Sequence, residues 1–420
     1  MPTLRAGLDV LTEKQLTHDQ AFKAVKTSST SPLIFRKGLD RKHEVAPVLA
    51  ESYHSELVAR VKQDGFRYDS GRLTIHLARE FGFCYGVDRA VDYAYQTRSR
   101  FPDRTVYLTG EIIHNPHVND RLRDMGVRFL SDEGMSVDRI TPDDVVILPA
   151  FGVTIEALEA FVAKGCTLVD TTCGSVLNVW KNVKRYGEDG LTSVIHGKFW
   201  HEETRATASQ ASRGGGSHYL VVLNREQALQ ACDYIRHGGD RGAFLRTFEH
   251  AISPGFDPDV HLQRVGCANQ TTMLSSESLE IGELFRAAIR DRYGDADVAA
   301  RFRAFDTICS ATQDRQDAVL ALLAEQRLDV MLVLGGYNSS NTFNLARICA
   351  ARLPTFHIAD PTSLVSGNEI LHKPVDASSE TTAANWLPDG PLTVGLTSGA
   401  STPDNLVGAV IRRLDELANG

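Results

Sequence analysis

The chain lacks the features that mark membrane-spanning, secreted and nucleic-acid-binding proteins. No stretch approaches the ~18 consecutive apolar residues that cross a bilayer, and the first residues contain no apolar run typical of a secretory signal. Basic side chains are the minority, with 45 Lys and Arg against 53 Asp and Glu. A nucleic-acid backbone or an anionic membrane surface would favour a basic excess. We therefore expect a cytoplasmic protein with no nucleic-acid partner and no membrane partner.

Cysteine is also scarce, with seven in 420 residues. The number is odd, the spacing is wide and no CxxC occurs, which excludes a small zinc knuckle and argues against a disulfide scaffold. Separated cysteines in the cytosol either fill a hydrophobic core or belong to a site that the fold assembles. Cys166, Cys232, Cys267 and Cys349 match no motif, and we expect them to be core residues.

Short β-rich runs alternate with amphipathic stretches from residue 72 onward. RLTIHLA (72–78), TVYLTG (105–110) and DVVILPA (144–150) each precede a segment with helical periodicity. Runs of about five apolar residues followed by helices predict βα units and mainly parallel sheets. The sequence therefore predicts an α/β fold.

The same pattern suggests how the chain divides into domains. We expect an N-terminal extension and three α/β lobes, the second with an inserted connection at 236–268. The expected ranges are 1–71 for the extension, 72–173 for lobe 1, 174–305 for lobe 2 and 306–420 for lobe 3. The first strand region, 72–84, is a candidate to join lobe 3 instead of lobe 1.

Three cysteines lie in segments that resemble one another. TLVDTTCGSVLNVWKNV (167–183) and RAFDTICSATQDRQDAVL (303–320) both combine a short apolar run, Asp-Thr-x-Cys and a helix-like stretch, and the segment around Cys84 is a looser third copy. Such a repeat suggests three similar lobes that each offer one thiol from the end of a strand, where the next helix begins. A helix N-terminus favours thiolate over thiol, and three converging thiolates predict a metal site. Zinc and an iron–sulfur cluster with one open iron both remain possible here.

Polar loops and single polar residues surround these cysteines in the predicted layout. Asn338–Asn341 and Ser398–Pro403 each follow a strand and precede a helix, and their hydroxyls, amides and helix N-termini suit phosphate oxygens. The plainer interpretation is that these residues only cap helices. His114 and His201 could donate to the same anion or could be structural. One of the adjacent carboxylates Glu202 and Glu203 could donate a proton inside a phosphate- and metal-lined cavity, although adjacent carboxylates usually mark a solvated helix start. A hydroxyl of the run 270–272 could relay a proton or only cap the next helix.

Nine motifs make the chain resemble the 4-hydroxy-3-methylbut-2-enyl diphosphate reductase family, in its plant and cyanobacterial branch. They span most of 72–405 in the family's order and read GFCYGVDRAV (82–91), EIIHNPHVNDRL (111–122), PAFGVT (149–154), VDTTC (169–173), IHGKFWHEETRATAS (195–209), NQTTM (269–273), DTICSATQDRQDA (306–318), GGYNSSNT (335–342) and TSGASTPD (397–404). The resemblance implies a trefoil of three similar α/β lobes around a central iron–sulfur site.

The resemblance also implies an activity and the residues that carry it. The activity is reductive dehydroxylation of (E)-4-hydroxy-3-methylbut-2-enyl diphosphate to isopentenyl and dimethylallyl diphosphate, the last step of the methylerythritol phosphate route to isoprenoids. A [4Fe–4S] cluster would be held by Cys84, Cys173 and Cys309, and Glu203 would deliver protons with Thr271 beside the substrate hydroxyl. The substrate-binding residues would be His114, His201, Thr271, Ser339, Ser340, Asn341 and Ser401. The electron donor would be a redox protein, either ferredoxin or flavodoxin.

Two positions depart from the family pattern. Phe151 stands where the bacterial branch has a second phosphate-side histidine, so one phosphate contact is expected to be missing. Gly174 and Ser175 follow Cys173 where the family usually has proline, so a looser helix start is expected.

Two rival functions stay open: a zinc hydrolase that acts on a diphosphate, and a non-catalytic cluster sensor. The first would be colourless, and the second would form no product.

Overall fold

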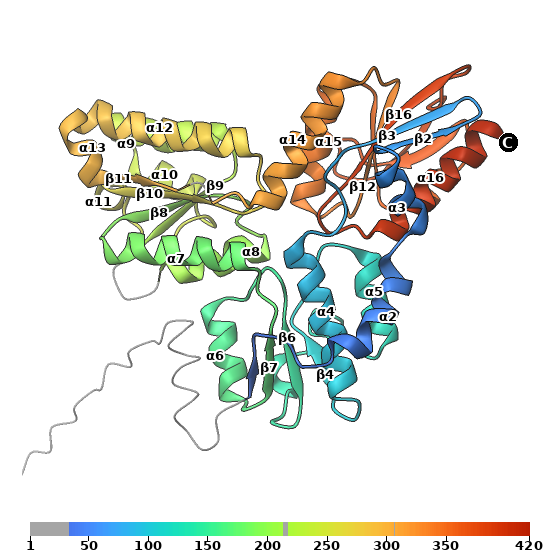
Figure 1. Cartoon of the computed structure of the whole chain (residues 1–420). Coiled ribbons are helices and arrows are strands. Elements are labelled where there is room, and N and C mark those ends of the chain that lie inside the picture. Colours follow the sequence, from blue (N-terminus) through green and yellow to red (C-terminus); the bar gives the residue numbers. More distant parts are fainter. Residues whose placement is uncertain (1–32, 213–216, 306) are drawn as a thin grey trace, which may run out of the picture.

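The structure is a computed structural model that describes residues 33–212, 217–305 and 307–420. Its strands form three main sheets with helices on their faces, and the three lobes surround a common centre (Figure 1). The predicted three-lobed α/β fold is confirmed. Residues 1–32 of the predicted N-terminal extension and Asp306 of the motif at 306–318 lie outside the described residues.

The first lobe holds a five-stranded sheet in which every pair of neighbouring strands is parallel. Its strands, in spatial order, are β1 (Ile34–Phe35), β7 (Thr167–Asp170), β6 (Val145–Leu148), β4 (Val106–Leu108) and β5 (Arg128–Phe129). Its helices are α2 (Lys42–Tyr53), α4 (Tyr85–Arg100), α5 (Pro116–Asp124) and α6 (Ile155–Ala163), with a short 3-10 turn at Val137–Arg139.

The second lobe holds a four-stranded parallel sheet. Its strands, in spatial order, are β11 (Phe302–Ala304), β10 (Val265–Asn269), β8 (Thr192–His196) and β9 (Tyr219–Val222). Its helices are α7 (Gly174–Glu188), α8 (Glu202–Ala211), α9 (Arg225–His237), α10 (Arg241–Thr247), α11 (Pro258–His261), α12 (Ser275–Tyr293) and α13 (Asp295–Arg301). The segment 236–268 contains α10 and α11, and Phe244, Phe248 and Phe256 join the core of this lobe.

The third lobe holds a five-stranded mixed sheet and a separate hairpin. Its strands, in spatial order, are β13 (Thr355–Ile358), β12 (Val330–Leu334), β16 (Leu392–Ser398), β3 (Leu73–Leu77) and β2 (Arg67–Ser70), and only the β2–β3 pair is antiparallel. The hairpin pairs β14 (Glu369–His372) with β15 (Thr381–Ala384). The helices are α3 (Glu56–Gln63), α14 (Ser310–Glu325), α15 (Ser340–Ala350) and α16 (Asp404–Asn419), with a 3-10 turn at Pro361–Ser363.

The strands form where the sequence has continuous apolar runs, because a sheet covered on both faces buries every side chain. All four residues of VVIL in β6 and all five of VMLVL in β12 are buried. Part of the N-terminal extension packs in the same way: Tyr53 of α2 lies in the core of the first lobe and Val58 of α3 in that of the third. The strand in 72–84 pairs with β16 of the third sheet. Division of the chain at 173 and 305 stays our proposal.

The chain changes lobe at each of the three cysteines in the repeated segments. It passes from β3 of the third sheet through Cys84 to α4 of the first lobe, and from β7 of the first sheet through Cys173 to α7 of the second. It then passes from β11 of the second sheet through Cys309 to α14 of the third lobe. The three crossings meet where the lobes meet, which brings residues 89 and 136 positions apart to one place.

The described residues were also searched for membrane spans. None of their helices is both long enough and apolar enough to cross a membrane.

Candidate active site

Each of the three cysteines is the N-cap residue of a long helix. Cys84 precedes α4, Cys173 precedes α7 and Cys309 precedes α14, and none of the three thiols makes a capping hydrogen bond to its own helix. The thiols therefore stand at three helix N-termini, where backbone N–H groups are unpaired and the helix dipole favours negative charge. The helix after Cys173 begins directly at Gly174 although proline is missing there.

One cavity at the junction of the lobes is lined by every residue predicted for the site. The predicted residues on its wall are Cys84, Cys173, Cys309, Glu203, Thr271, His114, His201, Ser339, Ser340, Asn341 and Ser401. They come from all three lobes and from loops that follow parallel strands, which is where ligands bind in open α/β sheets. The cavity itself is small, at about 80 Å³.

The thiols lie close together but are not packed as they would be around one ion. A Cβ built on Gly86 would stand 2.5 Å from Cys173 Sγ and 4.0 Å from Cys84 Sγ, so a side chain at residue 86 would enter the space that these thiols share. Three cysteines on a single zinc ion require sulfur atoms about 3.8 Å apart, given Zn–S bonds of about 2.3 Å. Among the described residues, the group of three possible ligands within 4.8 Å is His114, His201 and Glu202, not the cysteines. The thiol spacing therefore suits a core of several atoms better than a single ion.

Burial, rather than the helix dipole, controls the thiol protonation. Burial raises the pKa of Cys84 and raises that of Cys309 to about 11, although Thr312 lies 3.1 Å from Cys309 Sγ and opposes the shift. The backbone N–H groups at these two helix starts lower the pKa of the thiols, as expected, but desolvation of the charged form outweighs them. Thiolates here need a cation, which links their ionisation to metal binding.

Two histidines face each other on the wall of the same cavity. His114 Nε2 and His201 Nε2 are 3.0 Å apart, and His201 Nδ1 accepts the N–H of Glu203. Because His201 Nδ1 is an acceptor, its Nε2–H must donate to His114, whose Nδ1–H then donates to Glu111 at 2.7 Å. Burial lowers the pKa of His201 to about 3, with help from His114 and Lys198, so this imidazole is neutral.

Phe151 packs against this pair. Its ring stacks on His114 with centroids 4.2 Å apart and meets His201 edge-on at 5.5 Å. The residue that replaces the expected histidine therefore offers no hydrogen bond, as predicted, but it fixes the plane of the His114 ring. Glu111 was missed by the sequence analysis; its place three residues before His114, at the start of the EII run, was the available signal.

Glu203 is the most deeply buried carboxyl group on the cavity wall. It is 1% exposed, whereas its neighbour Glu202 is exposed. Thr271 donates its backbone N–H to Glu203 Oε1 at 2.6 Å and its hydroxyl to Oε2 at 3.0 Å. Burial raises the pKa of Glu203 to about 7, and the two Thr271 bonds only partly oppose the shift. This carboxyl group can hold or release a proton near neutral pH.

Small polar residues at two further helix starts complete the wall. Ser339 caps α15, and Ser340 accepts a hydrogen bond from Gln270 at 3.3 Å. Asn341 accepts the Ala400 N–H through Oδ1, while its buried Nδ2 has no partner among the described residues. A buried amide N–H₂ without an acceptor is costly, so this group is suited to an anionic oxygen. Ser401 donates to the His114 carbonyl at 3.2 Å.

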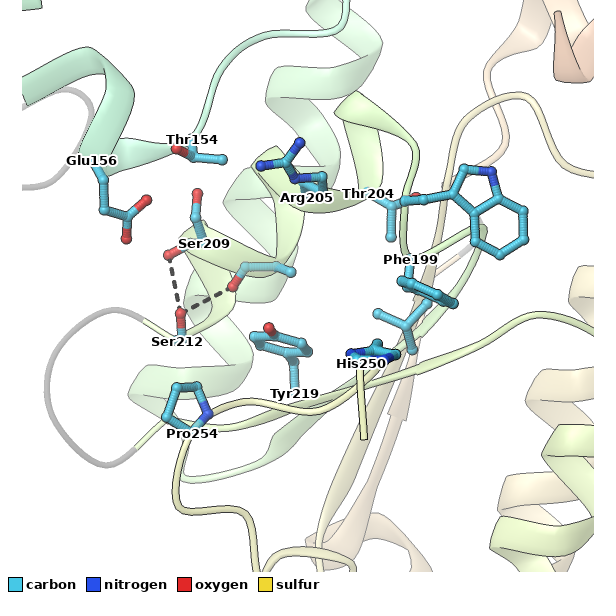
Figure 2. A pocket seen from close by; sticks show the side chains of 13 residues that line it. Thr154, Glu156, Phe199, Thr204, Arg205, Ser209, Ser212, Tyr219, His250 and Pro254 are labelled. Atoms are coloured by element: carbon cyan, nitrogen blue, oxygen red, sulfur yellow. Dashed lines mark hydrogen bonds between the residues drawn. The ribbon is translucent and has the colours of Figure 1, made fainter. Parts of the chain in front are cut away.

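A second and larger cavity, of about 580 Å³, lies on the outer side of α8 (Figure 2). Thr154, Arg205, Ser209, Tyr219 and His250 are among the residues on its wall, and none of the predicted site residues is. Helix α8 therefore presents His201 and Glu203 to the central cavity and Arg205 and Ser209 to this outer pocket.

The fold and the central cavity define a class of three-lobed α/β proteins with three cysteines at the lobe crossings and polar groups suited to an anion on the same cavity wall. The model of the family described as LytB protein matches residues 75–415, and the chain belongs to this family. Curated relatives carry the name 4-hydroxy-3-methylbut-2-enyl diphosphate reductase. That of Thermosynechococcus vestitus is 48% identical over 94% of this chain and 97% of its own length. That of Gloeobacter violaceus is 50% identical over 91% of this chain and 92% of its own.

Solved structures agree with the assignment to this family. A structure of (E)-4-hydroxy-3-methyl-but-2-enyl diphosphate reductase, described as the terminal enzyme of the non-mevalonate pathway, is 28% identical, covers 81% of this chain and 99% of its own, and has a TM-score of 0.50. A reductase structure from Plasmodium falciparum, with 20% identity over 80% of this chain and 86% of its own, has a TM-score of 0.58 and supports the fold alone.

Proposed function

We propose that this chain removes the hydroxyl group of (E)-4-hydroxy-3-methylbut-2-enyl diphosphate and forms isopentenyl and dimethylallyl diphosphate, the last step of the methylerythritol phosphate route. The relatives named for this reaction support the proposal. The single observation that carries it is the cavity that collects three thiols, one buried carboxyl group and an anion-suited wall from three lobes. We place the enzyme in the cytoplasm.

The cofactor in this proposal is a [4Fe–4S] cluster held by Cys84, Cys173 and Cys309. Three ligands, each at the start of a helix and too widely spaced for one ion, fit such a group with one iron left open. When bound, the cluster supplies single electrons and a Lewis-acidic iron for the hydroxyl end of the substrate.

The polar residues of the cavity wall hold the diphosphate. Asn341 Nδ2 is free to donate among the described residues, and the Ser339, Ser340 and Ser401 hydroxyls can turn toward the anion. His114 and His201 bond to each other here, and an anion that accepts hydrogen bonds from both rings would separate the pair. Because the cavity holds only about 80 Å³, entry of substrate requires the lobes to move apart and then close, which excludes water.

Glu203 supplies the proton that leaves with the hydroxyl oxygen. In the overall change R–OH accepts two electrons and two protons and gives R–H and water, so the C–O bond breaks and a C–H bond forms. With a pKa near 7 the buried carboxyl group can be protonated before the step, and Thr271 holds both of its oxygens in place. The electrons come from a redox protein, for which we propose ferredoxin, with flavodoxin as the alternative.

Product analysis tests the proposed function. The anaerobically purified protein, reduced with dithionite and methyl viologen and given the allylic diphosphate, is expected to yield both isoprenoid diphosphates with consumption of two electrons each. Release of inorganic phosphate in their place would instead indicate a hydrolase. A reduced protein that carries a cluster and forms no product would be a sensor.

A further inference from the structure

The reaction proposed above consumes electrons that must reach the buried thiols from outside, and the inference here rests on that function. Three helices run from the thiols to the surface, so each could guide a donor. Their exposed charges differ sharply. Asp88 is the exposed charged residue of α4, and those of α14 are Asp314, Asp317 and Glu325.

The exposed face of α7 is basic instead. Its exposed charged residues are Lys181, Lys184, Arg185 and Glu188, and Glu188 lies 3.7 Å from Lys184. Among the described residues, Lys181 and Arg185 have no ion-pair partner. At 100° per residue these positions fall on one side of the helix, in line with exposed Leu177.

This basic face begins beside a thiol. With a rise of about 1.5 Å per residue, Leu177 lies about 6 Å and Lys181 about 12 Å along the axis from Cys173. The exposed ring of Phe305, four residues before Cys309, stacks on buried Tyr186 with centroids 6.1 Å apart, but Tyr186 lies half a turn of α7 away from Leu177, so Phe305 is not part of the basic face. An exposed leucine bordered by basic side chains thus lies near one of the three thiols, that of Cys173.

We propose that the α7 surface, formed by Leu177, Lys181, Lys184 and Arg185, docks a small acidic one-electron carrier protein. The chain as a whole carries a net charge of −8 and repels such a carrier, so a local basic face is needed to attract and orient it. The acidic exposed face of α14 would turn the same carrier away. Docking on α7 places the donor at the helix that starts at Cys173.

The test uses the holoenzyme and a plant-type [2Fe–2S] ferredoxin as the probe. In the variant with Lys181→Glu, Lys184→Glu and Arg185→Glu, the Kd for oxidised ferredoxin by titration calorimetry at low salt is expected to rise at least about tenfold. The KM for reduced ferredoxin should rise by the same factor, while turnover with methyl viologen stays unchanged. Added salt should erase the difference from wild type. The milder Lys181→Gln should shift the Kd in the same direction by a smaller factor.

A matched control reverses charge on the other face of the same lobe. Arg286→Glu with Arg290→Glu, both on α12, should leave the ferredoxin Kd within about twofold of wild type, because these side chains lie on the helix opposite α7 (Figure 1). Unchanged ferredoxin binding in the α7 variant would overturn the proposal, as would equal losses with ferredoxin and methyl viologen in Lys181→Gln. A wild type that forms no product with methyl viologen would contradict the reaction itself, whereas the calorimetric titration judges docking separately.

Discussion

The central cavity and the outer pocket lie on the two sides of helix α8, and they differ in chemistry far more than in size. The outer pocket is the larger, at about 580 Å³ against about 80 Å³. Its wall nevertheless holds no cysteine and none of the predicted site residues. On the inner side Glu203 is fully buried, accepts two hydrogen bonds and has a raised pKa; on the outer side Arg205 is exposed. The comparison shows that convergent polar groups at helix starts, rather than volume, mark the site in this fold.

Removal of a thiol from the central cavity should have the largest effect on activity of any change to either cavity. Cys309→Ser is expected to lose essentially all turnover and most bound iron, because oxygen is a poor substitute for a thiolate ligand. Iron analysis and turnover with methyl viologen measure both effects. A Cys309→Ser protein with full iron content and activity would remove this cysteine from the site.

Two variants that each replace a charged side chain by glutamine compare the two sides of α8 directly. Glu203→Gln is expected to retain iron and substrate binding and to lose about 10²–10⁴-fold in turnover, because the amide cannot deliver a proton. Arg205→Gln, two residues away on the outer side, should stay within about twofold of wild type. Equal turnover in the two variants would mean that Glu203 has no part in proton delivery.

The pH dependence of the reaction rate tests whether Glu203 delivers the proton. Burial raises the Glu203 pKa to about 7, so the protonated donor predominates below that pH and is lost above it. Single-turnover rates of reduced enzyme should therefore fall about tenfold per pH unit well above pH 7. Glu203→Gln should remove this fall, and a wild-type profile flat up to pH 9 would contradict the assignment.

Substitutions among the polar residues proposed to bind the diphosphate should reduce activity less than loss of a thiol or of Glu203. Asn341→Ala removes the buried amide whose Nδ2 lacks a partner among the described residues, and it is expected to raise the substrate KM about tenfold, as a charge-assisted hydrogen bond is worth about 1.5–3 kcal/mol. Ser209→Ala, on the wall of the outer pocket, is the matched control. Steady-state kinetics with both variants decide whether the amide or only the cavity shape matters.

The smallest effect is expected for a cysteine outside both cavities. Cys349 is 0% exposed in the core of the third lobe, so Cys349→Ala should cost about 1 kcal/mol of unfolding free energy and leave turnover unchanged. Denaturant unfolding of the aerobic protein measures the loss. A change in iron content in this variant would show that the thiol does more than fill the core.

The fold class and the meeting of the three cysteines could be predicted because both depend on local patterns. Apolar runs followed by helical periodicity mark βα units, and the repeated Asp-Thr-x-Cys marks the ends of strands. All four cysteines without a motif lie in hydrophobic clusters or against them, as expected for core residues. Each of these statements needs only a short window of sequence.

Other features depend on contacts between distant segments and could not be predicted. That the chain changes lobe at Cys84, Cys173 and Cys309 follows from which strands pair, and no local pattern encodes that choice. The raised pKa values of Cys84 and Cys309 reflect burial where the lobes meet, which outweighs the backbone N–H groups at the helix starts and which no short window of sequence reveals. The stacking of Phe151 on His114 joins residues 37 positions apart and gives its position a role that the sequence analysis described only as a lost contact.

The central claim is that Cys84, Cys173 and Cys309 together hold one iron–sulfur core with a vacant iron position. A Mössbauer spectrum of the anaerobically purified protein, enriched in ⁵⁷Fe, tests it most directly. We predict one iron that is distinct from three others and that alone changes its signal when the allylic diphosphate is added. Four equivalent irons, or a colourless protein that contains zinc in place of iron, would contradict the account.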